Sequence, residues 1–363
     1  MINHIKNGWK NNCGFILTFS NGSFFESSKT NGFTHIAEHL MFSGTKNIPK
    51  IELDKIFVNT LHDLEAVTSR EALSVFCYFN LNDFEIAVKT IYDFIYNWEC
   101  TADQFKDEKS QLVDESQEYF SSFDYKKRKY VYPSLPIHQS EPLGSLKLLK
   151  SLKFDDVKAI KSYWNVFVKK SNIDIIVMTG NISNNQKKLV NKLFAKIQNK
   201  TVYDKAKKSV SGKIELKRSG GFYFSGNGYN PKSLLLNEIY KNRWMFEDKF
   251  DFDYDFVQID NVTAFFVFHI KENIDGDLLK EFFYKIITKS EFDTAKKSFL
   301  KKFNERIDSV NIVDSLRWFA GFQSRNYLEI EGIKDNPEKL YRYFEKIDYK
   351  EMLNFAKSIQ KCN

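Results

Sequence analysis

Residues 35–39 read His-Ile-Ala-Glu-His, a pattern that restricts the local fold more than any other part of the chain. Residues four apart lie on one face of a helix, so a helix here lets the imidazoles of His35 and His39 reach a single metal ion. Glu38 is close enough to hold a water molecule at that metal. Zinc in hydrolytic enzymes usually takes three protein ligands and keeps a fourth position for water. The pattern therefore predicts a zinc site whose third ligand comes from elsewhere in the chain.

A second segment, residues 102–119, offers candidates for the third ligand. It contains neither Gly nor Pro and is rich in good helix formers. Glu108, Leu112 and Glu115 recur with helical spacing and share one stripe of the expected helix. Ionised carboxylates avoid buried faces unless they are paired or bind a metal, so one of these glutamates can face inward as a ligand. A solvated acidic face with one leucine against the core explains the spacing equally well, and spacing alone leaves both interpretations open.

The surroundings of the first motif resemble the inverzincins, the family of pitrilysin, insulysin and the mitochondrial processing peptidases. The first domain of that family reads roughly G-x-A-H-x-x-E-H-M-x-F-x-G-T, and residues 32–45 of this chain read GFTHIAEHLMFSGT. Glu115 lies 76 residues after His39, which is the family's spacing to its third ligand. Glu108 lies at the position of a further family glutamate, seven residues earlier.

Three later segments also resemble the family pattern, and they occur in the family's order. They are a strand entrance at residues 66–71, the segment after a hairpin at residues 142–145 and a strand end at residues 175–181. With the zinc motif they extend the resemblance over about residues 8–200. Several ordered matches are far more specific than a five-residue motif, which a chain of 363 residues can contain by chance.

The resemblance implies a zinc-dependent metalloendopeptidase. His35, His39 and Glu115 would bind Zn2+, and two neutral imidazoles with one carboxylate leave such a site a net charge of about +1. Glu38 would be the general base, which takes a proton from water and passes it to the leaving amine. Glu108 would orient a ligand or share the proton load.

The resemblance also implies how a peptide substrate binds. The peptide would add as a β-strand to the edge of a sheet, because backbone hydrogen bonds tolerate many side chains. The expected contacts are Glu65, Ala66, Val67 and Thr68. The family has asparagine where this chain has Glu65, so the side-chain contact at this position departs from the family pattern.

A second departure concerns the family's substrate clamp. The second domain of the family often carries an Arg followed seven residues later by a Tyr, and these side chains hold substrate carbonyls. In this chain Phe250 lies seven residues after Arg243, and Glu247 lies seven residues before Tyr254. The pair is therefore absent or displaced.

The order of strand-like and helix-like segments predicts an α+β fold. Strands are expected at residues 14–19, 72–79, 173–178, 221–225, 254–259 and 263–270. Helices are expected at residues 32–43, 81–96, 154–164, 184–196, 231–240, 277–287, 291–304 and 338–344. A polar, basic linker at residues 201–213 would separate a zinc-bearing domain, residues 1–200, from a shortened second domain, residues 214–363. The resemblance implies that these are two homologous layered domains, each a mainly antiparallel sheet covered by helices.

Composition narrows the classes of partner. Hydrophobic residues make up 42% and charged residues 28%, which is typical of globular proteins. The net charge of +7 favours acidic peptides, but no nucleic-acid-binding motif is recognisable. The apolar run at residues 15–19 is too short for a secretory signal, and no window reaches the length of a membrane span. Four cysteines without C-x-x-C spacing fit a reducing compartment. We therefore expect a cytoplasmic protein that binds neither nucleic acid nor membranes.

Small members of the family build a closed chamber from two chains, one of which gives the zinc and the other the substrate clamp. The resemblance therefore implies a heterodimer with a second homologous subunit. Such a chamber favours short, unstructured peptides, and both leader removal from a ribosomally made peptide and general peptide turnover fit it. The alternative is a non-catalytic structural or binding subunit of a peptidase complex. Retention of all the expected ligands and of the expected base favours an enzyme.

Overall fold

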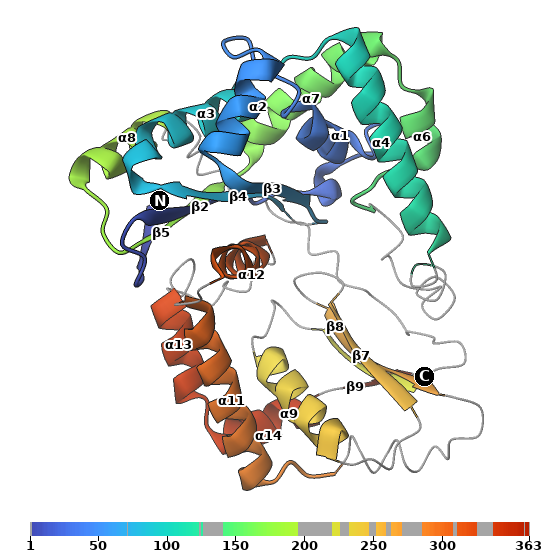
Figure 1. The fold of residues 1–363 in the computed structure, drawn as a ribbon. Coiled ribbons are helices and arrows are strands. Elements are labelled where there is room, and N and C mark those ends of the chain that lie inside the picture. Colours follow the sequence, from blue (N-terminus) through green and yellow to red (C-terminus); the bar gives the residue numbers. More distant parts are fainter. Residues whose placement is uncertain are drawn as a thin grey trace. The chain divides into compact units, whose positions relative to one another are not determined.

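The computed structural model describes residues 2–70, 72–122, 125, 141–194, 220–225, 232–246, 252–258, 263–270, 285–307, 311–324, 337–358 and 360–362. Contacts divide the chain into two compact units, which Figure 1 shows in the colours of the sequence. The first unit comprises Met1–Tyr125, Ile137–Lys205 and Asp308–Asn326. The second comprises Lys126–Pro136, Ala206–Ile307 and Tyr327–Asn363. The predicted linker, residues 201–213, lies outside the described residues, so the predicted boundary stays a prediction.

The first unit is built on a five-stranded sheet with the order β1-β5-β2-β4-β3. Neighbouring strands run antiparallel except for β1 and β5, which run parallel. The central strands β2 and β4 contain almost continuous apolar and aromatic residues, as expected of strands that are covered on both faces. The strand bounds are Ile2–Lys6 for β1, Asn12–Phe19 for β2, His62–Thr68 for β3, Leu73–Asn80 for β4 and Ile173–Thr179 for β5.

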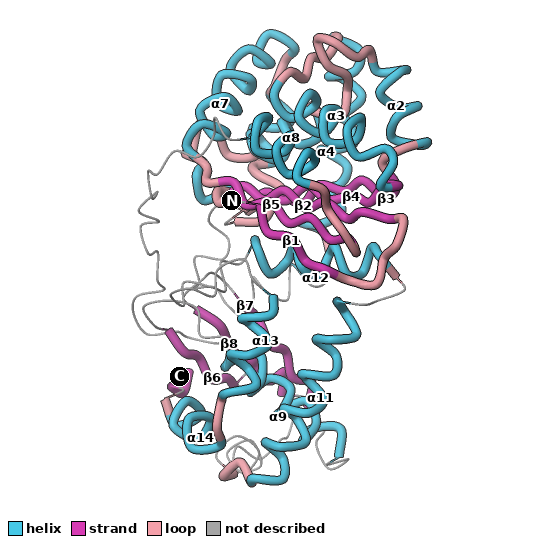
Figure 2. Tube along the Cα trace, turned by 90° about the vertical axis from the view of Figure 1, so that its left-hand side faces the viewer, coloured by secondary structure: helices cyan, strands magenta, loops and turns pink. Residues whose placement is uncertain are grey.

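Helices cover both faces of this sheet, and Figures 1 and 2 agree on the arrangement. A layer of helices lies on one face: α1 (Phe33–Leu40), α2 (Lys50–Asn59), α3 (Phe84–Tyr96), α4 (Ala102–Ser121), α6 (Leu146–Ser151), α7 (Val157–Lys170) and α8 (Asn184–Phe194). The opposite face of β2 and β4 is covered by α12 (Ile312–Ser324), which comes from far along the chain. None of the described helices combines the length and the apolar character needed to cross a membrane.

Aromatic side chains fill the core between the sheet and its helical layer. Trp164 of α7 stacks on Phe167 with ring centroids 5.2 Å apart, and both rings contact Phe19 of β2. The indole N–H of Trp164 donates to the carbonyl of Ile95 at 2.8 Å, so this buried ring leaves no polar atom unpaired.

The second unit contains a four-stranded antiparallel sheet with the order β7-β8-β6-β9. Its strands are β6 (Gly220–Ser225), β7 (Phe252–Gln258), β8 (Thr263–Ile270) and β9 (Gln360–Cys362). Its helices are α9 (Lys232–Phe246), α11 (Lys289–Ile307), α13 (Pro337–Lys346) and α14 (Tyr349–Lys357). Each unit thus has a mainly antiparallel sheet together with helices, which confirms the predicted α+β fold class.

Most of the expected elements exist. For each of the six expected strands, the first and last residues lie within two residues of the predicted bounds. The expected helix at residues 277–287 lies mostly outside the described residues, and its last three residues are not helical. The sequence patterns did not predict six elements of the fold: β1, α2, α6, α12, α14 and β9. Helix α12 also falls in the sequence region assigned to the second domain, whereas its contacts group it with the first unit.

Candidate metal centre and active site

Helix α1 carries the first motif as an almost wholly buried element. Seven of its eight residues are buried, including His35 and Glu38. His35 and His39 lie one turn apart, and their rings meet edge to face with centroids 4.9 Å apart. The i and i+4 spacing therefore brings both imidazoles to the same side of the helix, as the sequence predicts.

Helix α4 brings the distant glutamates to α1. It begins at a complete capping box, in which Thr101 and Gln104 satisfy each other's backbone N–H groups. Leu112 is fully buried, while the side chains of Glu108 and Glu115 are 19% and 50% exposed. Both interpretations of this stripe are therefore partly correct. Leu112 packs in the core, while Glu108 and Glu115 lie at its edge beside the histidines.

Three side chains converge to form a candidate metal site. Oε2 of Glu115 lies 3.8 Å from Nε2 of His35 and 3.7 Å from Nε2 of His39. One ligand atom from each residue lies within 4.8 Å of the others. In the described part of the chain, this is the one group of at least three His, Cys, Asp or Glu side chains that lie close enough to hold a metal ion. Ligand distances of about 2.0–2.2 Å to zinc place neighbouring ligand atoms roughly 3–4 Å apart, so this set fits a metal ion.

The two histidines have different electrostatic environments. Burial and the neighbouring His39 lower the pKa of His35 to about 3, which keeps its imidazole neutral and able to ligate. Burial alone would also lower the pKa of His39. Nδ1 of His39 is hydrogen bonded to Oε2 of Glu108 at 3.2 Å. This bond and the nearby carboxylates outweigh burial and raise the pKa of His39. Glu108 thus fixes the ring of His39, in the way that residues outside the ligand set orient metal ligands.

Glu38 lies beside this site without being one of the three ligands. It is 7% exposed, and burial raises the pKa of its carboxyl group to about 7. A short hydrogen bond from the hydroxyl of Thr68 and the charge of His39 act against this rise. A carboxyl group with a pKa near neutrality can both accept and return a proton, which is what a general base of this kind needs.

Strand β3 forms the edge of the sheet beside Glu38, and it contains all four expected substrate contacts. Thr68 faces α1, so alternation along the strand places Ala66 on the same face and Glu65 and Val67 on the opposite one. The carboxylate of Glu65 accepts two hydrogen bonds from the guanidinium of Arg317 on α12, one of them 2.9 Å long. Arg317 was not expected at this position, because nothing in the local sequence links it to a strand 252 residues away.

Residues 4–132 match the family model described as Insulinase (Peptidase family M16). This part of the chain is a Peptidase M16 domain. The match includes the three residues of the candidate metal site, His35, His39 and Glu115, and the neighbouring Glu38 and Glu108.

Curated relatives share part of this M16 similarity. The probable mitochondrial-processing peptidase subunit beta of Schizosaccharomyces pombe is 30% identical over 184 residues, which cover 49% of this chain and 39% of that protein. Subunit 1 of the cytochrome b-c1 complex of Bos taurus is 33% identical over 97 residues, or 27% of this chain and 20% of that protein. The chain therefore spans about two fifths or less of the length of these relatives.

Solved structures extend the similarity in fold to nearly the whole chain. A protease from Helicobacter pylori has a TM-score of 0.72 at 18% identity, covering 99% of this chain and 95% of the other. The first half of the periplasmic protease PqqL from Escherichia coli has a TM-score of 0.66 at 14% identity, covering 98% and 86%. At these identities the likeness shows a shared M16-type fold.

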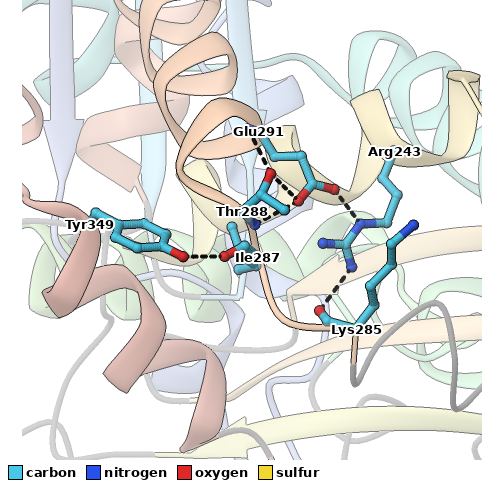
Figure 3. Close-up of polar contacts among 6 residues, drawn as sticks. All are labelled: Arg243, Lys285, Ile287, Thr288, Glu291 and Tyr349. Atoms are coloured by element: carbon cyan, nitrogen blue, oxygen red, sulfur yellow. Dashed lines mark hydrogen bonds and ion pairs between the residues drawn. The ribbon is translucent and has the colours of Figure 1, made fainter.

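Figure 3 shows the polar contacts of Arg243, the arginine of the second unit whose spacing was compared with that of the family's substrate clamp. Arg243 is 3% exposed, and its Nε donates to Glu291 at 2.8 Å while Nη1 donates to the carbonyl of Lys285 at 3.3 Å. Glu291 also accepts the backbone N–H of Thr288 at 2.7 Å. The guanidinium therefore ties the segment before α11 to α9, and it is not available to hold a substrate carbonyl.

We expect Arg243→Ala to lower the free energy of unfolding by about 2–4 kcal/mol, because it leaves the partly buried Glu291 carboxylate without its cation. Urea unfolding followed by circular dichroism measures the loss. Lys241→Ala, an exposed change on the same helix, serves as the control and should change stability by less than about 0.5 kcal/mol. Equal stability of the two variants would contradict the structural role.

Proposed function

We propose that this protein is a zinc-dependent endopeptidase that cleaves short, unstructured peptides. The observation that carries the proposal is the convergence of His35, His39 and Glu115 within ligating distance of one point, with the Glu38 carboxyl group beside them. The M16 domain supports a peptidase, since the same residues lie inside the matched region.

The residues divide the work of hydrolysis. A zinc ion held by the two imidazoles and Glu115 would supply Lewis acidity toward the carbonyl of the scissile peptide bond. Glu38 takes a proton from the attacking water and returns it to the leaving amine, and its raised pKa suits both steps. Glu108 holds the ring of His39 through Nδ1, which leaves Nε2 directed at the site. Thr68 holds the carboxyl group of Glu38 in place from the edge strand.

The edge strand suggests how substrate is held. Among the residues that the structure describes, strand β3 pairs with β4 on one side only, so we propose that its other side accepts an extended peptide next to Glu38. Recognition through the backbone suits peptides of varied sequence. Leader removal from a ribosomally made peptide and general peptide turnover, in the cytoplasm, are the two contexts we propose. Digestion of a panel of unstructured peptides, with products identified by mass spectrometry, would separate a narrow specificity from a broad one.

We further propose that the active form contains a second homologous subunit. Two relatives support this: one is by name a subunit of mitochondrial-processing peptidase, and the other is the first half of a longer protease. The buried Arg243 in this chain leaves the substrate clamp to be supplied by the partner.

The purified chain alone should therefore cleave unstructured peptides slowly. Addition of the correct M16 homologue from the same genome should raise kcat/KM by at least about 100-fold, since correct positioning of substrate accounts for factors of this size. Peptide cleavage combined with light scattering tests this, and a homologue without the H-x-x-E-H motif is the first candidate. Full activity from a monomer would rule the heterodimer out.

A non-catalytic role is the second candidate function. It is favoured by the similarity to a subunit of the cytochrome b-c1 complex, whose name does not describe a peptidase. The test is zinc stoichiometry together with peptide cleavage. One zinc ion per chain with cleavage supports the peptidase, and a metal-free chain that binds peptides without cleaving them supports the alternative.

A further inference from the structure

The helix that carries His35, Glu38 and His39 begins at a residue that has no side chain to cap it. Gly32 stands at the N-cap position with φ of 102°, in the left-handed region that favours glycine. A capping Ser, Thr or Asp has an extended backbone and a side-chain oxygen, and neither is available at this position. The first N–H groups of the helix therefore need an acceptor from elsewhere.

Glu26 supplies that acceptor from six residues earlier in the chain. Its Oε2 accepts the N–H of Gly32 at 2.7 Å, and its Oε1 accepts the N–H of Thr34 at 2.8 Å. The N–H between them, of Phe33, donates to the carbonyl of Thr30 at 2.9 Å. One carboxylate thus binds the backbone on both sides of the first helical residue, and its negative charge lies at the positive end of the helix.

Two further contacts hold the start of α1 against its neighbours. The hydroxyls of Thr34 and Tyr163 are hydrogen bonded at 2.7 Å, which fixes the rotation of the helix against α7. The backbones of Gly32 and Gly144 touch so closely that a Cβ on Gly144 would lie 2.3 Å from the Cα of Gly32. These contacts hold α1 against its neighbours, whereas the two hydrogen bonds of Glu26 bind the backbone of its first turn, so their loss would let that turn shift.

The length of the helix makes such a movement important for the metal centre. Helix α1 has eight residues and is therefore roughly 12 Å long. His35 lies within one turn of the two N–H groups that Glu26 binds, whereas Glu115 belongs to a different helix. A displacement of the start of α1 thus shifts the imidazoles relative to Glu115, which a different helix holds.

We propose that Glu26 is the positioning residue of this metal centre: its carboxylate fixes where α1 begins and thereby sets the two imidazoles against Glu115. The inference rests on the proposed zinc site and goes beyond it, because it assigns a role to a residue that is not one of the metal ligands. Glu26 acts through the backbone of α1, and its removal alters the geometry of the ligand set rather than its composition.

Metal affinity and metal geometry test this role directly. Glu26→Gln keeps the shape of the side chain but places an NH2 group against one of the two N–H donors, and Glu26→Ala removes both acceptors. We expect Glu26→Gln to weaken zinc binding about tenfold and Glu26→Ala to weaken it further, as changes to residues that orient ligands do. Glu26→Asp, which keeps the charge, should restore part of the affinity lost in Glu26→Ala.

Zinc affinity is measured by competition with a chromophoric chelator at about pH 8, above the pKa of about 7 to which burial raises Glu26. The absorption spectrum of the Co2+-loaded protein reports the geometry of the ligands, and we expect it to change in Glu26→Gln. Val88→Ala is the matched control, because Val88 is fully buried in α3, which belongs to the same unit and carries none of the metal ligands. It should lower the melting temperature while leaving both the zinc affinity and the cobalt spectrum as in the wild type.

Each outcome decides the matter. Glu26→Gln with wild-type zinc affinity and an unchanged cobalt spectrum would overturn the positioning role while leaving the zinc site intact. An equal loss of affinity in Val88→Ala would also overturn it, because the effect would then follow general stability. If Glu26→Ala does not fold, the isosteric Glu26→Gln decides alone. Wild-type protein that binds no zinc would instead overturn the proposed function, and the positioning role with it.

Discussion

Glu38→Gln is expected to abolish most peptide cleavage while the protein still binds one zinc ion. The amide has the shape of the carboxyl group, and its oxygen can still accept the hydrogen bond from Thr68, so the fold and the ligand set are preserved. It cannot take a proton from water, and loss of general base catalysis costs about 10²–10⁴-fold in rate. The measurements are kcat/KM on an unstructured peptide and zinc content by mass spectrometry.

The matched control for this experiment is Glu118→Gln. Glu118 is an exposed residue on α4, three positions beyond Glu115, and none of the described contacts links it to the metal centre. This variant should cleave and bind zinc as the wild type does. Normal cleavage by the Glu38→Gln variant would show that Glu38 is not the general base. Loss of zinc from the same variant would show that Glu38 also supports the metal ligands.

The second large effect on peptide cleavage is expected from removal of the zinc ion. Dialysis against a chelator should abolish cleavage, and one equivalent of Zn2+ should restore it. His39→Ala should show the same loss without recovery, because it removes a ligand and the hydrogen-bond partner of Glu108. Zinc should also stabilise the wild type by about 2.7 kcal/mol at a free concentration of 100 times Kd, since it binds the folded state.

Calorimetry of the apo and zinc-loaded proteins measures this stabilisation. His62→Gln is a suitable control, because His62 lies on β3 and packs against the ring of Tyr78 instead of taking part in the ligand set. It should keep zinc-dependent stabilisation and cleavage. Cleavage that survives complete removal of zinc would show that another chemistry operates at this site.

Local periodicity was sufficient to predict the two helices of the candidate site. Residues 35–39 and 102–119 carry their helical pattern within a few turns, so α1 and α4 could be recognised without knowledge of their neighbours. Spacing could not show whether Glu115 faces inward, because residues on one stripe of a helix can differ in burial. The Glu115 side chain is 50% exposed at the edge of the core, whereas Leu112 on the same stripe is fully buried. The family resemblance, rather than the pattern, supplied the pairing of the two helices.

Contacts between distant segments could not be predicted in this way. The apolar face of α12 packs on strands more than 230 residues earlier, and Arg317 of that helix binds Glu65 across 252 residues. Glu26 escaped notice for a different reason. Capping rules concern the residue at the start of a helix, whereas here the start is a glycine and the acceptor comes from a preceding loop.

The origin of α12 has a consequence for biosynthesis. A nascent chain leaves the ribosome from its amino terminus, so the face of β2 and β4 that α12 covers lacks this helix until residues 312–324 have emerged. Fragments that end before residue 312 would expose the apolar strands β2 and β4 to other molecules and would tend to aggregate. The covering of this face is therefore completed only after residues 312–324 have been synthesised, long after the two helices of the candidate metal site.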